Sequence, residues 1–315
     1  MPVVPMFDLK HRRVFVAGHR GMVGSAIVRR LGTVDCQVLT VPRSSLDLTR
    51  QSDVEDWFQA NKPDVVVLAA AKVGGIHANN VRPVDFLADN LSMELNVVRS
   101  SFEHGCKKLL FLGSTCIYPK FAKQPIAESE LLTGPLEPTN EWYAIAKIAG
   151  IKLCQAFRKQ YGSHFISAMP TNLYGPGDNY HPEDSHVVAA LIRRFHEAKL
   201  SNAEEVVVWG TGMPRREFLH VDDLADACIF LLENYSEGEI VNIGWGSDIA
   251  IGEFAELIAD IVNFQGRIVF DHSRPDGTPR KLVDTSRLNS LGWHPNIKLR
   301  KGLELTYQDF LGTLG

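Results

Sequence analysis

Short apolar runs alternate with amphipathic stretches along much of the chain. Val14 to Ala17 is apolar throughout, whereas Met22 to Leu31 repeats its apolar residues at the spacing of a helix. Asp64 to Ala71 holds a longer apolar run, typical of a central parallel strand that helices cover on both faces. The pattern predicts strands at 14–17, 37–41, 64–71, 108–113, 165–169 and 240–243, and helices at 22–31, 52–61, 85–104, 141–160 and 221–234.

This alternation predicts an α/β fold with a Rossmann-type, doubly wound parallel sheet. The alternation loosens after Gly177, where loop-forming sequence dominates, so we expect a smaller C-terminal α/β lobe there. We expect residues 1–171 to form a cofactor-binding Rossmann domain, with later segments near 217–262 returning to it. Residues 172–315 are expected to form mainly a substrate-binding lobe.

Three glycines, Gly18, Gly21 and Gly24, run from the end of the first predicted strand into the first turn of the first predicted helix. Their spacing is G-x-x-G-x-x-G, one residue wider than the common dinucleotide fingerprint. Glycines let a backbone turn tightly and approach a pyrophosphate, whose charge a helix N-terminus favours. We therefore expect a dinucleotide in contact with Gly18, His19, Arg20, Gly21, Met22, Val23 and Gly24.

The second predicted strand ends without the acidic residue that NAD enzymes usually place there to bind the adenosine ribose. The segment that ends it runs Val41-Pro42-Arg43-Ser44-Ser45 and holds no acid. An acid would repel a 2′-phosphate, whereas Arg43, together with Arg20, can pair with one. The sequence therefore favours NADP(H) over NAD(H), with a solvated loop arginine as the alternative interpretation of Arg43.

Tyr143 and Lys147 lie four residues apart in the predicted helix 141–160, so the phenol and the ammonium can face one site. Ser114 follows the predicted strand 108–113, at the edge of the sheet where open α/β folds bind ligands. The phenol of a free tyrosine has a pKa of about 10, and a nearby ammonium lowers this pKa by stabilising the phenolate. With the serine hydroxyl, the pair predicts a proton donor for a carbonyl that is being reduced by hydride.

Composition argues against several other classes of protein. The chain of 315 residues has a net charge of −4, which gives no electrostatic reason to expect nucleic acid or an anionic membrane as a partner. No apolar run approaches the ~20 residues of a membrane span, and the N-terminus has no signal-peptide pattern. Five scattered cysteines without a C-x-x-C pair favour reduced thiols and a cytoplasmic location.

Several motifs together resemble the extended short-chain dehydrogenase/reductase family, and within it the group that makes GDP-L-fucose. They cover nearly the whole chain: AGHRGMVG at 17–24, AAAKVGG at 69–75, LGSTCIYPK at 112–120, EPTNEWYAIAKIAG at 137–150, PTNLYG at 170–175, VWGTG at 208–212, REFLHVDD at 216–223 and PDGTPRK at 275–281. The resemblance implies an NADPH-dependent enzyme that converts GDP-4-keto-6-deoxy-D-mannose to GDP-L-fucose, by epimerising C3 and C5 and then reducing C4.

The resemblance also implies roles for residues at matching positions. Ser114, Tyr143 and Lys147 would form the reductase triad, and Cys116 and His186 the epimerisation pair. The GDP-sugar would contact Arg194, Trp209, Arg216 and Asp276. Further cofactor contacts would come from Leu112, Gly113, Ser114, Lys147, Pro170, Thr171, Asn172, Leu173 and His186. The family usually forms homodimers, here through helices 85–104 and 141–160.

Epimerisation requires an acid and a base that exchange protons near neutral pH, and Cys116 and His186 are residues of suitable types. A 4-keto group acidifies the hydrogens on C3 and C5, so inversion needs a base on one face of the sugar and an acid on the other. Free cysteine and histidine, with pKa values near about 8.5 and about 6.5, both exchange protons near neutrality. From the residues alone, Cys116 is more typical of a core thiol and His186 of a surface histidine. A metal site at His181 and His186 lacks a third ligand, so we expect none.

Three alternatives remain open to different degrees. Sugar-nucleotide 4,6-dehydratases share the fold but usually carry Asp-Glu where Cys116-Ile117 follows Thr115 here, which argues against dehydration. A related reductase or epimerase-reductase could act on another GDP-4-keto sugar, such as a dideoxy sugar or a heptose. An NADP-binding sensor or scaffold would be a different class, which the intact set of Ser114, Tyr143 and Lys147 disfavours.

Overall fold

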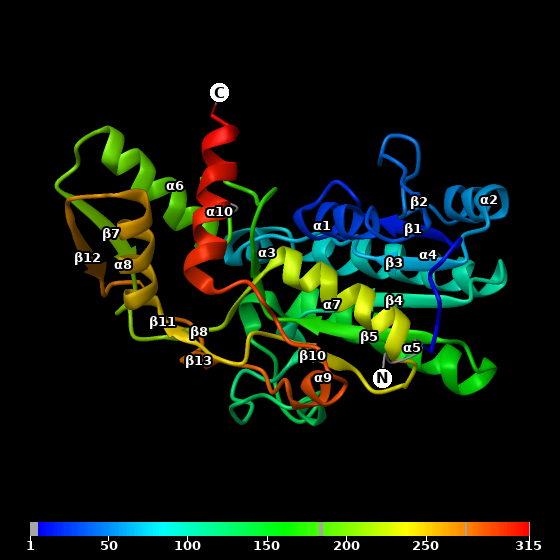
Figure 1. Cartoon of the computed structure of the whole chain (residues 1–315). Helices are drawn as coiled ribbons and strands as arrows, with labels where there is room; N and C mark the ends of the chain where they lie inside the picture. The colour runs from blue at the N-terminus through cyan, green and yellow to red at the C-terminus, as the bar shows by residue number, and fades with distance from the viewer. Residues whose placement is uncertain (1–5, 183–184, 275, 315) are drawn as a thin grey trace.

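The computed structural model describes residues 6–182, 185–274 and 276–314. Its largest sheet has six strands, all parallel, in the order β10-β5-β4-β3-β1-β2 (Figure 1). In that order the strands are Val241–Ile243, Phe165–Pro170, Lys108–Leu112, Val65–Leu68, Arg13–Ala17 and Gln37–Leu39. Because β2 lies on one side of β1 and β3 on the other, the winding reverses at β1, which confirms the predicted class.

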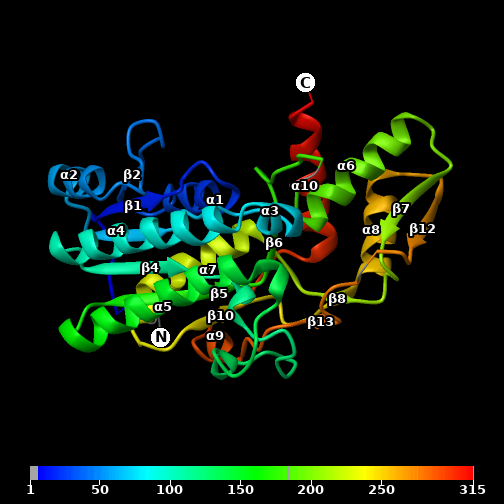
Figure 2. The ribbon, with the colours of Figure 1, turned by 180° about the vertical axis from the view of Figure 1, so that it is seen from behind.

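Helices cover both faces of this sheet. They are α1 Met22–Leu31, α7 Val221–Asn234, α2 Gln51–Asn61, α4 Asn90–Glu103 and α5 Glu141–Tyr161. Alternate residues of a strand enter different cores: Val14 packs with α1 and α7, whereas Phe15 packs with α2, α4 and α5. In Figure 1 α7 lies in front of the sheet, and in Figure 2, seen from behind, α4 and α5 do.

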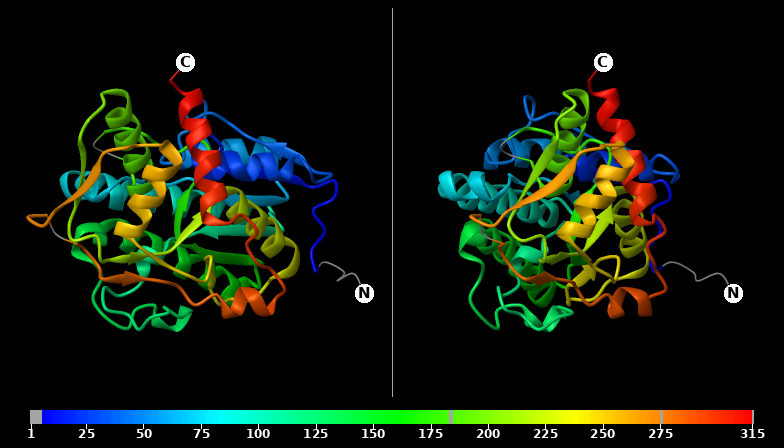
Figure 3. Two further views of the ribbon diagram at one scale, coloured as in Figure 1. Left: turned by 60° about the vertical axis from the view of Figure 1, so that its left-hand side comes forward. Right: turned by 90° about the vertical axis from the view of Figure 1, so that its left-hand side faces the viewer.

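A second, smaller lobe has its own apolar core. Its elements are α6 Val187–Leu200, α8 Ile251–Val262 and α10 Leu299–Gly312, with the parallel strands β7 Glu205–Trp209 and β12 Arg267–Asp271. Figure 3 shows this lobe turned towards the viewer, in front of the six-stranded sheet. The expected smaller lobe is therefore an α/β unit packed beside the first domain.

Short elements complete the molecule and link its two parts. β6 Asn172–Tyr174 pairs with β9 Phe218–His220, and β8 Arg215–Arg216 lies between β11 Ile249–Ala250 and β13 Arg280–Lys281. The remaining short elements are α3 Ile76–Val81, α9 Ser286–Ser290, the π-helical turn η1 Asp85–Asp89, and the 3₁₀ turns η2 Thr115–Ile117, η3 Glu128–Glu130 and η4 Pro138–Asn140.

Three elements differ in their limits from the sequence prediction by two residues or more. The strand expected at 64–71 spans only Val65–Leu68, so the alanines at its end lie in the loop that follows. The strand expected at 37–41 ends at Leu39, because a turn follows in which the carbonyl of Pro42 accepts hydrogen bonds from the amides of Ser45 and Leu46. The helix expected at 85–104 is divided into η1 and α4. Side chains of η1 are tied to the loop after β3 by the Lys72 ammonium, which the periodicity of the helix could not indicate.

The later segments divide between the two parts of the chain. β10 joins the large sheet and α7 covers it, as expected of segments near 217–262. The same expectation is wrong for α8, which packs in the second lobe because Phe254, Ile258 and Val262 complete that core. From this distribution of cores, we propose that the first domain ends at residue 171 and that the second lobe begins at residue 172.

Candidate active site

Ser114, Tyr143 and Lys147 lie together beyond the carboxyl end of β4. Tyr143 forms a hydrogen bond with Ser114, and Lys147 Nζ lies 5.8 Å from the centre of the Tyr143 ring. Burial raises the pKa of Tyr143, and the charges of Cys116 and Glu94 raise it further, whereas the hydrogen bond with Ser114 lowers it. The phenol is therefore held in its protonated form, which a proton donor requires.

Lys147 is buried between α5, α4 and the sheet. Its Nζ lies 4.7 Å from the centre of the Phe111 ring and 3.2 Å from Oε1 of Glu94. The side chains of Lys147 and Glu94 are each only 2% exposed. Sequence reasoning missed Glu94, although a glutamate on the buried face of α4, four residues after buried Asn90 and three before buried Val97, is a signal in itself.

Cys116 lies in η2, two residues after Ser114. Its backbone amide donates a hydrogen bond to Ser114 Oγ at 3.2 Å, and Lys281 Nζ lies 3.7 Å from its sulfur. The thiol is only half-buried and lines a pocket of about 50 Å³ together with Lys120, Asn140 and Lys281, among others. It is therefore accessible, unlike the core thiol that the residue type alone suggests. Lys281, from the distant strand β13, was not predicted as a neighbour.

His186 is the N-cap residue of α6, on the second lobe. Neighbouring protein lowers the pKa of His186 by desolvation, although the residue as a whole is exposed. No hydrogen bond or ion pair joins it to Cys116 in the described part of the chain, so the structure does not bring the expected epimerisation pair into contact.

The turn after β1 fits the pyrophosphate of a dinucleotide. Gly18 has a φ of +89°, and a Cβ there would lie 2.8 Å from the backbone of Ala70. A Cβ on Gly24 would lie 2.1 Å from the carbonyl oxygen of Gly18, so the strand-to-helix turn closes only with glycine at both positions. Gly21 is the N-cap of α1 and has no capping side chain, which leaves the first amides of the helix to a ligand.

The flanking residues of this turn have mixed environments. Met22 and Val23 are partly buried against the first core. Desolvation and the charge of Arg20 lower the pKa of His19. Arg20 and Arg43 are exposed, and neither forms a hydrogen bond or ion pair with any described residue. Both guanidinium groups are consequently available to a phosphate.

The other expected cofactor contacts follow the neighbouring strands of the same edge. Leu112 ends β4, and a Cβ on the next residue, Gly113, would lie 2.5 Å from the methyl carbon of Met169. Pro170 ends β5, and Thr171 is buried just beyond it. Asn172 and Leu173 lie in β6, where Asn172 Nδ2 donates to the carbonyl of Glu217 at 2.8 Å.

The four residues expected to contact a GDP-sugar come from the second lobe and from the segments that join it to the first domain, and they lie in two neighbouring groups. The guanidinium carbon of Arg194 lies 6.0 Å from the centre of the Trp209 ring, and Trp209 is 61% exposed. Asp276 accepts hydrogen bonds from the amide and hydroxyl of Thr211, at 2.7 and 2.9 Å, and these bonds lower its pKa. Arg216 is attracted by Asp276, while burial lowers the pKa of Arg216. Pro275, which begins the motif around Asp276, lies outside the described residues.

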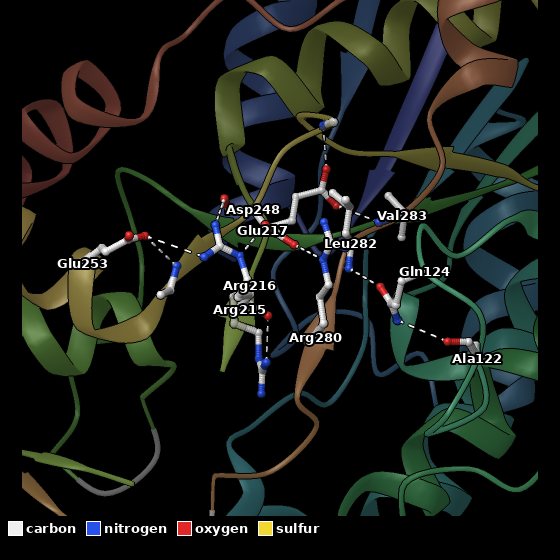
Figure 4. Close-up of polar contacts among 12 residues, drawn as sticks. Ala122, Gln124, Arg215, Arg216, Glu217, Asp248, Glu253, Arg280, Leu282 and Val283 are labelled. Carbon is white, nitrogen blue, oxygen red and sulfur yellow. Dashed lines mark hydrogen bonds and ion pairs between the residues drawn. The ribbon is translucent and has the colours of Figure 1, made fainter. Parts of the chain in front are cut away.

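A group of polar contacts fixes the strands β8 and β13, which carry Arg216 and Lys281 (Figure 4). Asp248, whose side chain is buried, binds Arg215 of β8 at 2.8 Å and also Arg280 of β13. Glu217 is fully buried and accepts hydrogen bonds from the amides of Gly246 and Val283, at 2.7 and 3.1 Å. The two carboxylates thus hold Arg216 and Lys281 at the junction between the lobes.

The described residues contain no group of three or more His, Cys, Asp or Glu side chains placed to hold a metal ion. None of their helices combines the length and apolar character needed to cross a membrane.

Comparisons with known proteins agree with this geometry. The model of the NAD dependent epimerase/dehydratase family matches residues 14–244. GDP-L-fucose synthase 1 of Arabidopsis thaliana is 64% identical over 303 residues, which are 96% of this chain and 94% of that protein. A GDP-L-fucose synthase of Escherichia coli (strain K12) is 55% identical over 313 residues, covering 96% of this chain and 98% of that protein.

Solved structures give the same picture. A GDP-L-fucose synthetase from Naegleria fowleri bound to NADP superposes with a TM-score of 0.91 at 27% identity, covering 99% of this chain and 98% of that one. The family that the motifs indicate is thereby confirmed over nearly the full length of the chain. The protein belongs to the NAD dependent epimerase/dehydratase family, and within it to the family of the GDP-L-fucose synthases.

Proposed function

We propose that this protein is an NADPH-dependent epimerase-reductase that converts GDP-4-keto-6-deoxy-D-mannose to GDP-L-fucose. The observation that carries the proposal is the arrangement beyond β4, where the serine, tyrosine and lysine of a carbonyl reductase adjoin an accessible thiol. A reductase needs only the first three groups. The half-buried Cys116 supplies a second kind of chemistry within the same turn.

Epimerisation is proton exchange at the carbons beside the ketone. Cys116 and His186 are the groups proposed to exchange these protons from opposite faces of the sugar, because both residue types work near neutral pH. Lys281 supplies positive charge next to the thiol. His186 would approach the sugar from the second lobe, so the substrate itself, bound between the lobes, would join the two groups.

Reduction requires a proton for the C4 oxygen and a hydride for C4. NADPH, when bound, supplies the hydride. Tyr143 gives its phenolic proton to the oxygen, and the Ser114 hydroxyl holds that oxygen in place by hydrogen bonding. Lys147 stabilises the phenolate that Tyr143 becomes, because a positive charge favours the ionised form of a neighbouring acid.

The second lobe would bind the nucleotide. Arg216 is proposed to face the diphosphate, since a guanidinium holds phosphate oxygens bidentately and no described carboxylate lies within ion-pair distance of it. Trp209, with Arg194 over its ring, offers an exposed aromatic surface beside this charge.

We also propose that the protein forms a homodimer in the cytoplasm. The exposed apolar side chains Leu95 of α4 and Trp142 and Ile145 of α5 lie on adjacent helices, as a helical dimer interface requires. The five cysteines are all free thiols, which suits a reducing compartment.

The proposed activity is tested by NADPH consumption with a panel of GDP-, UDP- and dTDP-linked 4-keto sugars. We expect consumption with GDP-4-keto-6-deoxy-D-mannose and much slower consumption with the UDP- and dTDP-linked sugars. Preference for a dideoxy sugar or heptose linked to GDP would transfer the proposal to a related reductase. Turnover with none of the sugars would favour the alternative that the protein is an NADP-binding sensor or scaffold without catalytic activity.

A further inference from the structure

Behind the proton donor lies a buried ion pair whose carboxylate, that of Glu94, has no role in the reaction scheme. Glu94 Oε1 lies 3.2 Å from Lys147 Nζ, and both side chains are excluded from water. Apart from Lys147, no described residue donates a hydrogen bond to either carboxylate oxygen of Glu94. The ion pair with Lys147 is thus the principal compensation for burying this charge.

The packing of α4 against α5 is shaped to receive this carboxylate. Gly150 of α5 faces it, and a Cβ at that position would lie 2.7 Å from Glu94 Oε2 and 2.4 Å from the Phe111 ring. Glu94 therefore occupies space that any larger residue at position 150 would take. A buried charge with one partner costs stability, so a purely structural role would be met better by an apolar residue.

We propose that Glu94 is a positioning residue for the reduction, whose carboxylate anchors the Lys147 ammonium and keeps it charged beside the Tyr143 phenol. This inference rests on the proposed function. Lys147 has three donors, and the contact with Glu94 takes only one of them. The other two can therefore turn towards the phenol and towards the cofactor.

The negative charge of Glu94 opposes proton loss from both Lys147 and Tyr143. Without a counter-ion, a buried ammonium gives up its proton more readily, because burial disfavours the charged form. The same negative charge contributes to the raised pKa of Tyr143. Removing it should make both groups lose their protons at lower pH, so the two effects add.

Other titratable groups that face the pair are few. On α5, Cys154 faces both members, and burial raises its pKa to about 12, so it stays a thiol over the range of interest. Cys116 of η2 faces Tyr143. The substrate-free NADPH titration, repeated in a Cys116→Ser background, removes the contribution of that thiol without depending on epimerisation.

The test is the variant Glu94→Gln, which keeps the shape of the side chain and removes its charge. The alkaline limb of the pH profile of kcat for reduction should move to lower pH by about one unit or more. At neutral pH kcat should fall about tenfold or more, because a general acid that is less well held loses part of its effect. The KM for the GDP-sugar should stay within about twofold, since the nucleotide contacts lie in the other lobe.

NADPH affinity, measured by fluorescence without substrate, gives a second readout. It should weaken at alkaline pH in Glu94→Gln more than in the unaltered protein, because the same ammonium is the expected cofactor contact. Glu103→Gln is the matched control: it removes the same charge from the same helix, where Glu103 is exposed and pairs with Arg99, and it should change neither profile.

Glu94→Asp retains the charge and should keep the alkaline limb in place, even if the shorter side chain lowers kcat. An unmoved limb with unchanged kcat in folded Glu94→Gln would overturn the inference. If Glu94→Gln does not fold, Glu94→Asp serves as the test instead: an alkaline limb that moves in this variant would overturn the inference. Failure of the unaltered protein to oxidise NADPH would instead contradict the proposed function, and the cofactor titration would still test Glu94.

Discussion

Ser114 and Cys116 lie two residues apart in one short turn, yet they are assigned to different halves of the reaction. The hydroxyl of Ser114 contacts the phenol of Tyr143, whereas the sulfur of Cys116 faces a pocket and the ammonium of Lys281. Proton exchange at carbon and protonation of the C4 oxygen therefore depend on different atoms. Substitutions at these positions should separate the two steps.

Cys116→Ser should suppress epimerisation while leaving the cofactor site intact. With substrate and NADP⁺ in D₂O no net reduction occurs, and the unaltered protein should introduce deuterium at C3 and C5. In the variant, exchange should fall about 100-fold or more, because a serine hydroxyl is a far weaker base at neutral pH. NADPH affinity should be unchanged, and deuterium uptake at the unaltered rate would remove Cys116 from the mechanism.

Arg43→Ala should reduce the preference for NADPH over NADH. One charge-assisted hydrogen bond to the 2′-phosphate contributes about 1.5–3 kcal/mol, so NADPH should bind about tenfold or more weakly in the variant. NADH affinity should stay nearly constant. The matched control is Arg300→Ala, an exposed arginine that is paired with Asp260 in the second lobe. Equal affinity of the unaltered protein for both cofactors would contradict the assignment.

At the scale of elements, the sequence predicted best where one pattern decides the outcome. The helix at 22–31 and the helix at 221–234 have the predicted limits, because each carries an apolar stripe that is buried in the first core. The same kind of stripe in α8 does not reveal which core it completes, and so its place in the second lobe was missed. Local periodicity determines whether a segment forms a helix or a strand, whereas the core against which that element packs depends on the rest of the chain.

The candidate site shows the same limit. Motif spacing identified Ser114, Tyr143 and Lys147, which the fold brings together beyond the carboxyl end of β4. Lys281 could not be predicted as the neighbour of Cys116, because β13 reaches that turn only through the junction of the lobes. Glu94 could have been suspected as a charge on an otherwise buried helix face.

Asp248→Ala tests the junction drawn in Figure 4. Its carboxylate binds the arginines next to Arg216 on β8 and next to Lys281 on β13, so its loss should loosen both strands. The KM for the GDP-sugar should rise about tenfold, while NADPH affinity stays within about twofold, since the cofactor edge lies in the first domain.

Asp260→Asn provides the control for this prediction, because it breaks an exposed aspartate–arginine pair of the second lobe away from the junction. It should leave both constants unchanged. An unaltered KM in Asp248→Ala would show that β8 and β13 hold their positions without this carboxylate.

At the scale of the whole molecule, the apolar side chains of α4 and α5 are expected to be covered by a second copy. In a two-fold dimer each substitution occurs twice in one interface, so Leu95→Glu should place two charges there and yield monomers. Light scattering after size exclusion should give twice the chain mass of 35.1 kDa for the unaltered protein and the single mass for the variant.

Leu305→Glu, at a comparably exposed leucine of α10, is the control and should leave the mass unchanged. A monomeric unaltered protein at micromolar concentration would contradict the proposed homodimer and leave the exposed face of α4 and α5 without an occupant.

The central claim is that one site carries out both epimerisation and reduction, and product analysis in D₂O tests it most directly. The protein is supplied with GDP-4-keto-6-deoxy-D-mannose and unlabelled NADPH, and the product is analysed by NMR. The account predicts GDP-L-fucose with deuterium at C3 and C5 and hydrogen from NADPH at C4. A reduced product without deuterium at C3 and C5, and with the configuration of the starting sugar there, would contradict it.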